Sequence, residues 1–245
     1  MVTMRPEPLL ILPAVPPAAQ LFVLLHGESA DPAQLLNVVA AIRQAFSSAV
    51  IIQPYAPFGD QEERRWIAQA APDAESYVQL VADAAASLAG EIRAWQRQYG
   101  LRGEQTAIVG FSEGAAVALE ACSIPGLAGR ALLFSTRFAT LPESAPPATT
   151  LHLLHGAQDP VAPADQARQV HARFADLNAD VTLDIASGVG HHLHAALIQQ
   201  AIVRLQTCVP LRSWEAAMGA PDARVDEYSA VDPDSKNPPG SRTLH

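Results

Sequence analysis

Seven short aliphatic runs, separated by longer segments, constrain the fold of this chain more than any other feature of its sequence. They are residues 9–12, 21–26, 49–53, 106–111, 130–135, 149–155 and 181–186. Alternation of such runs with amphipathic segments predicts βαβ units and a mostly parallel sheet. Because the runs are almost wholly apolar rather than alternating, both faces of the sheet should be covered by helices. The sequence therefore predicts a three-layer α/β fold.

Amphipathic periodicity marks three of the expected helices. The longest begins after Asp73, which is placed as an N-cap, and ends before Gly100. Its apolar residues, at steps of three and four, are Tyr77, Val81, Ala84, Leu88, Ile92, Trp95 and Tyr99. The two later stripes are Ala167, Val170, Phe174 and Leu177, then Ile198, Ile202 and Leu205. We expect all three stripes to face the core.

The length of 245 residues suits one domain, which we place at residues 1–219. Residues 220–245 are mainly Pro, Asp, Ser and Gly, so we expect a mobile tail there. No apolar run approaches the roughly 20 residues that span a bilayer, and prolines interrupt the apolar start of the chain. The sequence thus predicts a soluble protein without an export signal.

Charge and cysteine content exclude further classes of protein. The net charge is −9, and the sixteen basic residues form no stripe that could neutralise a run of phosphates, which argues against nucleic-acid binding. Acidity also disfavours anionic membranes. Two cysteines, Cys122 and Cys208, are too few for a disulfide scaffold, so we expect a cytoplasmic protein. The sequence leaves open a homodimer.

Residues 106–120 combine a buried strand, a Gly-x-Ser-x-Gly motif around Ser112, and a helix rich in small residues. This order is typical of a nucleophile elbow, a sharp turn that strains the serine backbone and projects its hydroxyl above the sheet. Gly110 and Gly114 should keep neighbouring Cβ atoms out of the turn. The pentapeptide alone also occurs by chance, so its strand and helix context carries the prediction that Ser112 is a nucleophile.

A serine nucleophile needs a histidine to accept its proton and a carboxylate to hold that histidine. Downstream of an elbow serine, the acid precedes the base. The strand at residues 149–155 opens into a loop that bears Asp159, which we predict to be the acid. The alternatives are Asp165 at the start of the next helix, and a structural Asp159 that only forms a turn with Pro160.

The base is expected in the loop after the last strand, where His191 follows a glycine turn. His192 is the alternative, and His194 should face the following helix. Three histidines can also bind zinc, but no Asp, Glu or Cys accompanies them at ligand spacing, so we predict no metal. The histidines expected to form local hydrogen bonds are His26, His152, His155 and His171.

An oxyanion needs backbone N–H donors, and the elbow pattern assigns these to Glu113 and to Glu28, which follows the strand at residues 21–26. An ionised carboxylate that points inward would oppose the anion, so we expect both side chains to point outward. Their field should disfavour substrates with a free carboxylate near the scissile bond.

Residues 55–72 lack clear periodicity but carry aromatic side chains, which favours a loop beside the site. We therefore predict Phe58 and Trp66 as substrate-binding residues.

Several motifs together resemble the phospholipase/carboxylesterase family of α/β-hydrolases, and within it the small bacterial YpfH-type serine esterases. The resemblance runs from about residue 21 to residue 218. It rests on Leu24-Leu-His-Gly27, Arg65-Trp66, Gly110-Phe-Ser-Glu-Gly114, Arg137-Phe-Ala-Thr-Leu-Pro142, His155-Gly-Ala-Gln-Asp-Pro160, Asp180-Val-Thr-Leu-Asp-Ile185 and Gly190-His191. The family usually has Gln where this chain has Glu113, and a small or apolar residue in place of Glu28.

The resemblance implies an α/β-hydrolase fold and cofactor-free hydrolysis of a small acyl ester by Ser112, Asp159 and His191. No helical insertion between the late strands resembles a lid, so a small soluble substrate is expected. An acyl-protein thioesterase or lysophospholipase is the enzymatic alternative. A non-catalytic binding protein with the same fold is the alternative from another class.

Overall fold

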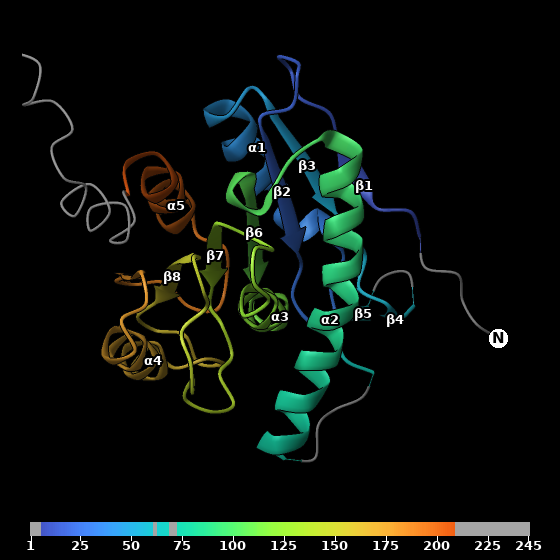
Figure 1. The fold of residues 1–245 in the computed structure, drawn as a ribbon. Coiled ribbons are helices and arrows are strands. Elements are labelled where there is room, and N and C mark those ends of the chain that lie inside the picture. The colour runs from blue at the N-terminus through green and yellow to red at the C-terminus, as the bar shows by residue number, and fades with distance from the viewer. Residues whose placement is uncertain (1–5, 61–62, 69–72, 209–245) are drawn as a thin grey trace, which may run out of the picture. The chain divides into compact units, whose positions relative to one another are not determined.

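The computed structural model describes residues 6–60, 63–68 and 73–208, in which a seven-stranded sheet runs in the order β1-β3-β2-β6-β7-β8-β9 (Figure 1). The strands are β1 (Leu9–Ile11), β2 (Gln20–Leu25), β3 (Ala49–Gln53), β6 (Thr106–Phe111), β7 (Arg130–Phe134), β8 (Thr150–Gly156) and β9 (Val181–Ala186). All neighbouring strands are parallel except β1, which is antiparallel to β3. The predicted mostly parallel sheet is confirmed.

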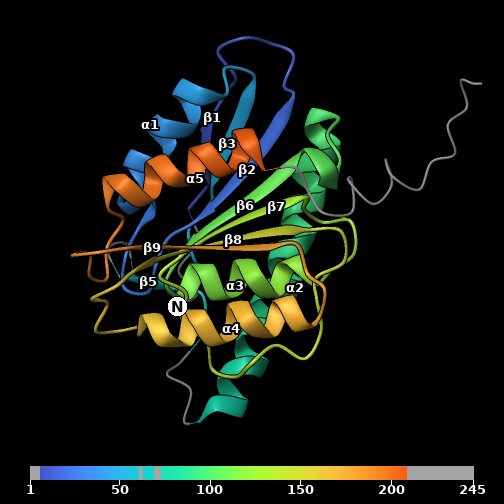
Figure 2. The same cartoon turned by 90° about the vertical axis from the view of Figure 1, so that its left-hand side faces the viewer.

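Helices cover both faces of this sheet. They are α1 (Leu36–Ala45), α2 (Ala74–Tyr99), α3 (Glu113–Cys122), α4 (Ala164–Asp176) and α5 (Ala195–Thr207), with 3₁₀ turns η1 (Pro32–Leu35) and η2 (Gly103–Gln105). Figure 2 shows α1 and α5 on one face and α2, α3 and α4 on the other. The expected three layers are therefore present.

The alternation of side chains along the strands divides the core into two parts. Along β2, Leu21, Val23 and Leu25 belong to the core beneath α2, α3 and α4, whereas Phe22 and Leu24 belong to the core beneath α1 and α5. Successive residues of a strand point to opposite faces, so an apolar run supplies both cores at once. This explains why β3, β6 and β8 are buried at every position.

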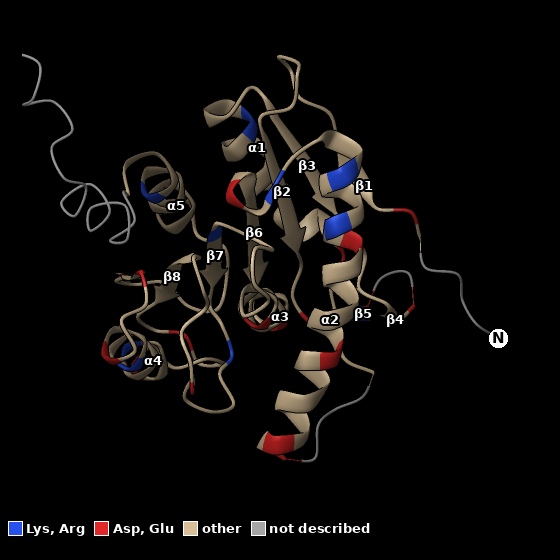
Figure 3. Cartoon of the chain, in the orientation of Figure 1, with Lys and Arg blue, Asp and Glu red and all other residues tan. Residues whose placement is uncertain are grey.

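Helix α2 begins and ends as its sequence predicts. The Asp73 side chain accepts a hydrogen bond of 2.8 Å from the Ser76 N–H, and Gly100 adopts a left-handed φ of 66° at the other end. Its first turn carries the acidic Glu75 and its last turn carries Arg97, which matches the helix dipole. Across the described elements, Figure 3 shows the basic residues dispersed.

Two segments were not identified from the sequence. Helix α1 has no capping side chain of its own, because its N-cap is Leu35; the start signal stands one turn earlier, where the Asp31 side chain caps the 3₁₀ turn η1 and Pro32 opens it. The hairpin of β4 (Phe58–Gly59) and β5 (Arg64–Arg65) lies within the segment expected to be a loop. Strands of two residues are too short to produce a detectable alternation.

Parallel strands leave the sheet in the same direction, so the loops after β2, β6, β8 and β9 meet at one edge. Within the described ranges, no helix has both the length and the apolarity required to cross a bilayer. The predicted domain boundary near residue 219 and the predicted tail lie outside the described residues.

Candidate active site

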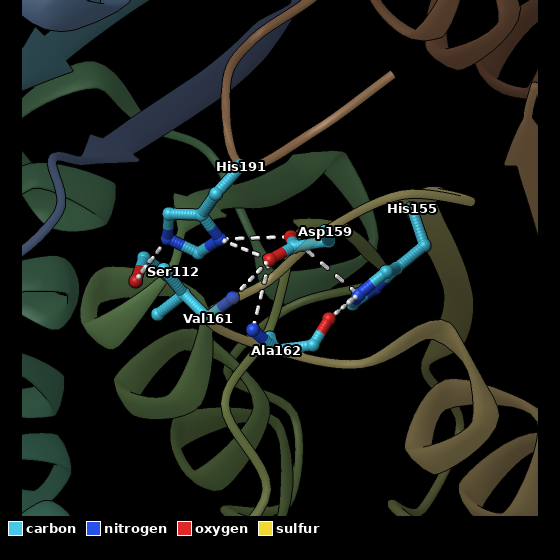
Figure 4. Close-up of polar contacts among 6 residues, drawn as sticks. All are labelled: Ser112, His155, Asp159, Val161, Ala162 and His191. Carbon is cyan, nitrogen blue, oxygen red and sulfur yellow. Dashed lines mark hydrogen bonds and ion pairs between the residues drawn. The ribbon is translucent and has the colours of Figure 1, made fainter. Parts of the chain in front are cut away.

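Three residues far apart in the sequence form a hydrogen-bonded chain at this edge (Figure 4). Ser112 follows β6, Asp159 follows β8, and His191 follows β9. His191 Nε2 lies 3.0 Å from Ser112 Oγ, and His191 Nδ1 lies 2.8 and 3.0 Å from the two carboxylate oxygens of Asp159. The carboxylate requires a proton on Nδ1, which leaves Nε2 to accept the serine proton.

The turn at Ser112 has the expected strain. Its φ of 54° and ψ of −114° are unusual for a residue with a side chain. A Cβ on Gly110 would lie 2.5 Å from Ala115 Cα, and a Cβ on Gly114 would lie 2.3 Å from the His26 carbonyl oxygen. Both glycines are thus required by the close approach of α3 to the strands, as predicted.

The carboxylate of Asp159 is buried and held by its own loop. It accepts hydrogen bonds of 2.9 Å from the Val161 N–H and 2.8 Å from the Ala162 N–H (Figure 4). Burial by itself would raise the pKa of Asp159, but the bonds from Ala162, His191 and Val161 outweigh it and lower the pKa below its usual value. Asp159 is therefore a carboxylate at neutral pH.

His155 lies behind this carboxylate. Its Nε2 is 2.6 Å from the Ala162 carbonyl oxygen and 3.7 Å from Asp159 Oδ2. Burial lowers the pKa of His155, so the ring is neutral and donates its Nε2 proton to Ala162. This agrees with the expected local role and fixes the loop that holds Asp159.

The loop of His191 is fixed by close backbone contact with the loop of Asp159. The Gln158 N–H donates to the Val189 carbonyl at 2.9 Å, and a Cβ on Gly156 would lie only 2.4 Å from that same oxygen. The imidazole of His191 also packs against the Phe111 ring, with centroids 5.0 Å apart. The contact between the two loops thus holds the backbone near His191, and the contact with Phe111 holds its ring.

The alternative acid, Asp165, and the alternative base, His192, make other contacts. Asp165 is exposed in the first turn of α4 and pairs with Arg168 at 2.7 Å. His192 stacks edge-on against His194, whose Nδ1 accepts the Ala196 N–H and caps α5. The structure thus brings His191, and neither of the other two histidines of this loop, to Ser112.

The two residues predicted to supply the oxyanion donors lie in neighbouring segments, and their role stays a prediction. Glu113 is the first residue of α3, where backbone N–H groups lack intrahelical acceptors. Glu28 lies in the loop after β2, and the Gly27 N–H before it is fixed by Gln34 Oε1 at 2.7 Å. Gly114 packs α3 against the end of β2, so the two segments lie side by side.

The expectation for the two glutamate side chains is correct for one and wrong for the other. Glu28 points outward and pairs with Arg137 at 3.0 Å. Glu113 instead points inward and is 1% exposed, because its Oε2 accepts the backbone N–H of Trp66 at 2.6 Å. Burial raises the pKa of Glu113 to about 6, although the bond from Trp66 opposes that shift.

Phe58 and Trp66 both line a cavity of about 280 Å³ beside α2, together with Ile67, Leu80 and Leu88. The Phe58 ring is exposed, whereas Trp66 is buried and its indole N–H donates to the His26 carbonyl at 2.8 Å. None of Ser112, Asp159 and His191 lines this cavity. A role for these two residues in binding substrate therefore stays a prediction.

A second cavity of about 330 Å³ lies beside the predicted oxyanion donors. Glu28 and Glu113 line it with Ile67, Tyr77 and Arg137. Sequence reasoning did not identify Arg137 as a partner of Glu28, since the two residues are 109 positions apart and no local spacing links them. In the part of the chain that the structure describes, no group of three His, Cys, Asp or Glu side chains is arranged to hold a metal ion.

Comparison with known proteins places this geometry in a family. The sequence model of phospholipases and carboxylesterases matches residues 8–209. Esterase YpfH of Escherichia coli (strain K12) is 34% identical over 207 residues, which are 82% of this chain and 88% of that protein.

Solved structures share the fold. The crystal structure of esterase PE8 has a TM-score of 0.75 at 24% identity, over 84% of this chain and 100% of that chain. The carboxylesterase of Bacillus cereus has a TM-score of 0.68 at 15% identity, over 81% of this chain and 92% of that chain. With the family match and the curated relative, they show that this chain belongs to the phospholipase/carboxylesterase family of α/β-hydrolases and is a carboxylic ester hydrolase.

Proposed function

We propose that the protein is a serine carboxylesterase that hydrolyses small soluble acyl esters through Ser112, His191 and Asp159. One observation carries the proposal: the imidazole of His191 lies within hydrogen-bond distance of both the Ser112 hydroxyl and the Asp159 carboxylate. This geometry suits a general base whose tautomer is fixed by a buried anion.

In the first half of the reaction, Ser112 Oγ attacks the ester carbonyl while His191 Nε2 takes the hydroxyl proton. The backbone N–H groups of Glu28 and Glu113 donate to the tetrahedral oxyanion. The carbon–oxygen bond to the alcohol then breaks, and His191 returns the proton to the departing alkoxide. The acyl group remains on Ser112 as an ester.

In the second half, water loses a proton to His191 and attacks the acyl-enzyme. The new tetrahedral anion uses the same two donors. As it collapses, the bond to Ser112 Oγ breaks, His191 returns its proton to that oxygen, and the carboxylic acid leaves. Asp159 stays ionised throughout and stabilises the imidazolium that forms twice.

The preference for small substrates rests on the surroundings of the site. In the described part of the chain, residues 135–149 between β7 and β8 contain no helix that would act as a lid. The 330 Å³ cavity beside Glu28 and Glu113, which none of the three triad residues lines, has room for a short acyl group only. The free thiols of Cys122 and Cys208 support a cytoplasmic location.

A fluorophosphonate probe tests the proposal directly. It should label the wild-type protein and fail to label Ser112→Ala, whose turnover should fall on the order of 10⁶-fold. Full esterase activity in Ser112→Ala would refute the assignment, and absence of labelling in the wild type would favour the non-catalytic alternative.

A substrate panel then defines the acyl and leaving groups. p-Nitrophenyl esters of increasing chain length, run beside a palmitoylated peptide and a lysophospholipid, separate a small-ester hydrolase from a thioesterase or lysophospholipase. Matched neutral and anionic esters test the charge preference, and equal turnover of the two would dismiss an effect of Glu28 and Glu113.

A further inference from the structure

We infer that the side chain of Glu113 is a positioning residue that ties together the two segments bearing the oxyanion donors. The inference rests on the proposed function, since it concerns the same site. The backbone N–H of Glu113 is one of the two proposed oxyanion donors. The carboxylate of Glu113 binds the segment that contains Trp66, and that segment in turn contacts the loop that carries the other donor, Glu28.

The first contact is the bond from the Trp66 backbone N–H to Glu113 Oε2, which measures 2.6 Å. Both residues are buried, with Trp66 2% exposed and Glu113 1% exposed. A buried N–H without an acceptor is strongly unfavourable, so Trp66 depends on this carboxylate to remain in place.

The second contact leads from Trp66 to the loop after β2. Its indole N–H donates to the His26 carbonyl oxygen at 2.8 Å, and its ring lies 5.5 Å from the His26 ring. The ring of His26 accepts the Ala56 N–H at 3.1 Å, so the residue is held at its side chain as well as its carbonyl. Glu28 is two residues further along the chain.

A third contact joins the same two segments on the far side of Glu28. Ala30 and Arg64 exchange backbone hydrogen bonds of 3.2 and 3.4 Å, and the Arg64 guanidinium donates to the Ala56 carbonyl at 3.0 Å. The loop of Glu28 is therefore attached before and after that residue to the segment that contains Arg64 and Trp66. Among these contacts, the Glu113 carboxylate is the one made by a side chain of α3.

The role requires an acceptor oxygen and does not require a charge. The Coulombic effect of Glu28 disfavours ionisation of Glu113, whereas Arg137 and Arg65 favour it. Burial raises the pKa of Glu113 to about 6, which shows that the surroundings tolerate the charge poorly. A glutamine would keep the acceptor and remove the charge.

The test compares Glu113→Ala with Glu113→Gln, using purified full-length protein and a p-nitrophenyl ester. We expect Glu113→Ala to lower kcat about ten-fold or more with little change in KM, but less than the roughly 10²–10³-fold that follows loss of a donor itself. Glu113→Gln should stay within about three-fold of wild type, because a neutral amide oxygen still accepts the bond.

Three controls separate positioning from other causes. Glu104→Ala, on the exposed η2 turn, removes a carboxylate away from the site and should leave kcat unchanged. Fluorophosphonate titration of each variant normalises rates to folded sites, so loss of folded protein alone would not lower kcat. Trp66→Phe breaks the same connection at its other end and should also lower kcat, and its effect should be less than additive with Glu113→Ala.

Either of two results would overturn the inference. One is wild-type kcat in Glu113→Ala, or in Trp66→Phe if the alanine variant does not fold. The other is a loss in Glu113→Gln as large as in Glu113→Ala, which would assign the effect to charge. If the wild-type protein itself resists the probe, the proposed function fails instead, and the two failures are thus distinguishable.

Discussion

The contact between Gly114 and the end of β2 allows a sharp test of how the site is built. In Gly114→Ala, the new Cβ would lie 2.3 Å from the His26 carbonyl oxygen and 2.6 Å from the Leu25 carbonyl oxygen. Ordinary contact begins near 3.4 Å, so α3 and β2 must separate by about 1 Å (3.4 minus 2.3). Both obstacles are backbone atoms, and the His26 carbonyl is also bonded to Trp66, so neither can rotate away.

The expected change in the free energy of unfolding of Gly114→Ala is the difference between two opposing effects. Overpacking of this kind costs about 1–3 kcal/mol, and the better helix propensity of alanine returns at most about 1 kcal/mol. The free energy of unfolding should therefore fall by roughly 1–2 kcal/mol, which lowers Tm by about 2–8 °C for a chain of this size. A displacement of about 1 Å between the two oxyanion donors should lower kcat on the order of 100-fold.

Thermal unfolding and p-nitrophenyl ester kinetics measure the two effects. Gly90→Ala is the matched control, because Gly90 lies inside α2 and a Cβ there meets no atom within 4 Å. That variant should gain about 0.5–1 kcal/mol of stability and keep wild-type kcat. Wild-type Tm and kcat in Gly114→Ala would refute the steric reasoning, as would an equal loss in both variants.

Two further predictions concern the buried carboxylates. Asp159→Asn should fold but lose on the order of 10⁴-fold in kcat, because an amide no longer holds the His191 tautomer; near-wild-type ester turnover would contradict this. Glu113 has a pKa raised from 4.5 to about 6, so its charge destabilises the folded state above pH 6 and this penalty disappears below pH 4.5. Glu113→Gln should accordingly be about 2 kcal/mol more stable than wild type at pH 8 and equal to it at pH 4, as urea titrations at both pH values would reveal.

The strands of the seven-stranded sheet were predictable because they are short aliphatic runs, most of which contribute to both cores, and their observed ends differ from the predicted ones by one residue at most. The long helix α2 was predictable because Asp73 and Gly100 mark its ends. Helix α1 was not predicted, because the residues that mark its start, Asp31 and Pro32, belong to the preceding 3₁₀ turn and lie one turn before the helix itself. The elements that could be predicted are therefore those with a clear apolar run or with capping residues at their own ends.

Within the site, the positions of Ser112, Asp159 and His191 follow from chain order and strand ends. The inward direction of Glu113 does not, because it depends on an N–H of Trp66 that lies 47 positions earlier. Electrostatic reasoning alone favoured an outward carboxylate, and it omitted the need of a buried backbone N–H for an acceptor. The pairing of Glu28 with Arg137 could not be predicted either, because the two residues are 109 positions apart in the chain.

The order of strands in the sheet also governs when a folding chain acquires its chemistry. Ser112 and His191 are 79 residues apart, and they meet only after β6, β7, β8 and β9 have paired in their native register. Parallel pairing of this kind has high contact order and is slow. Recovered hydrolysis during refolding therefore reports completion of that half of the sheet, whereas recovered helical circular dichroism does not.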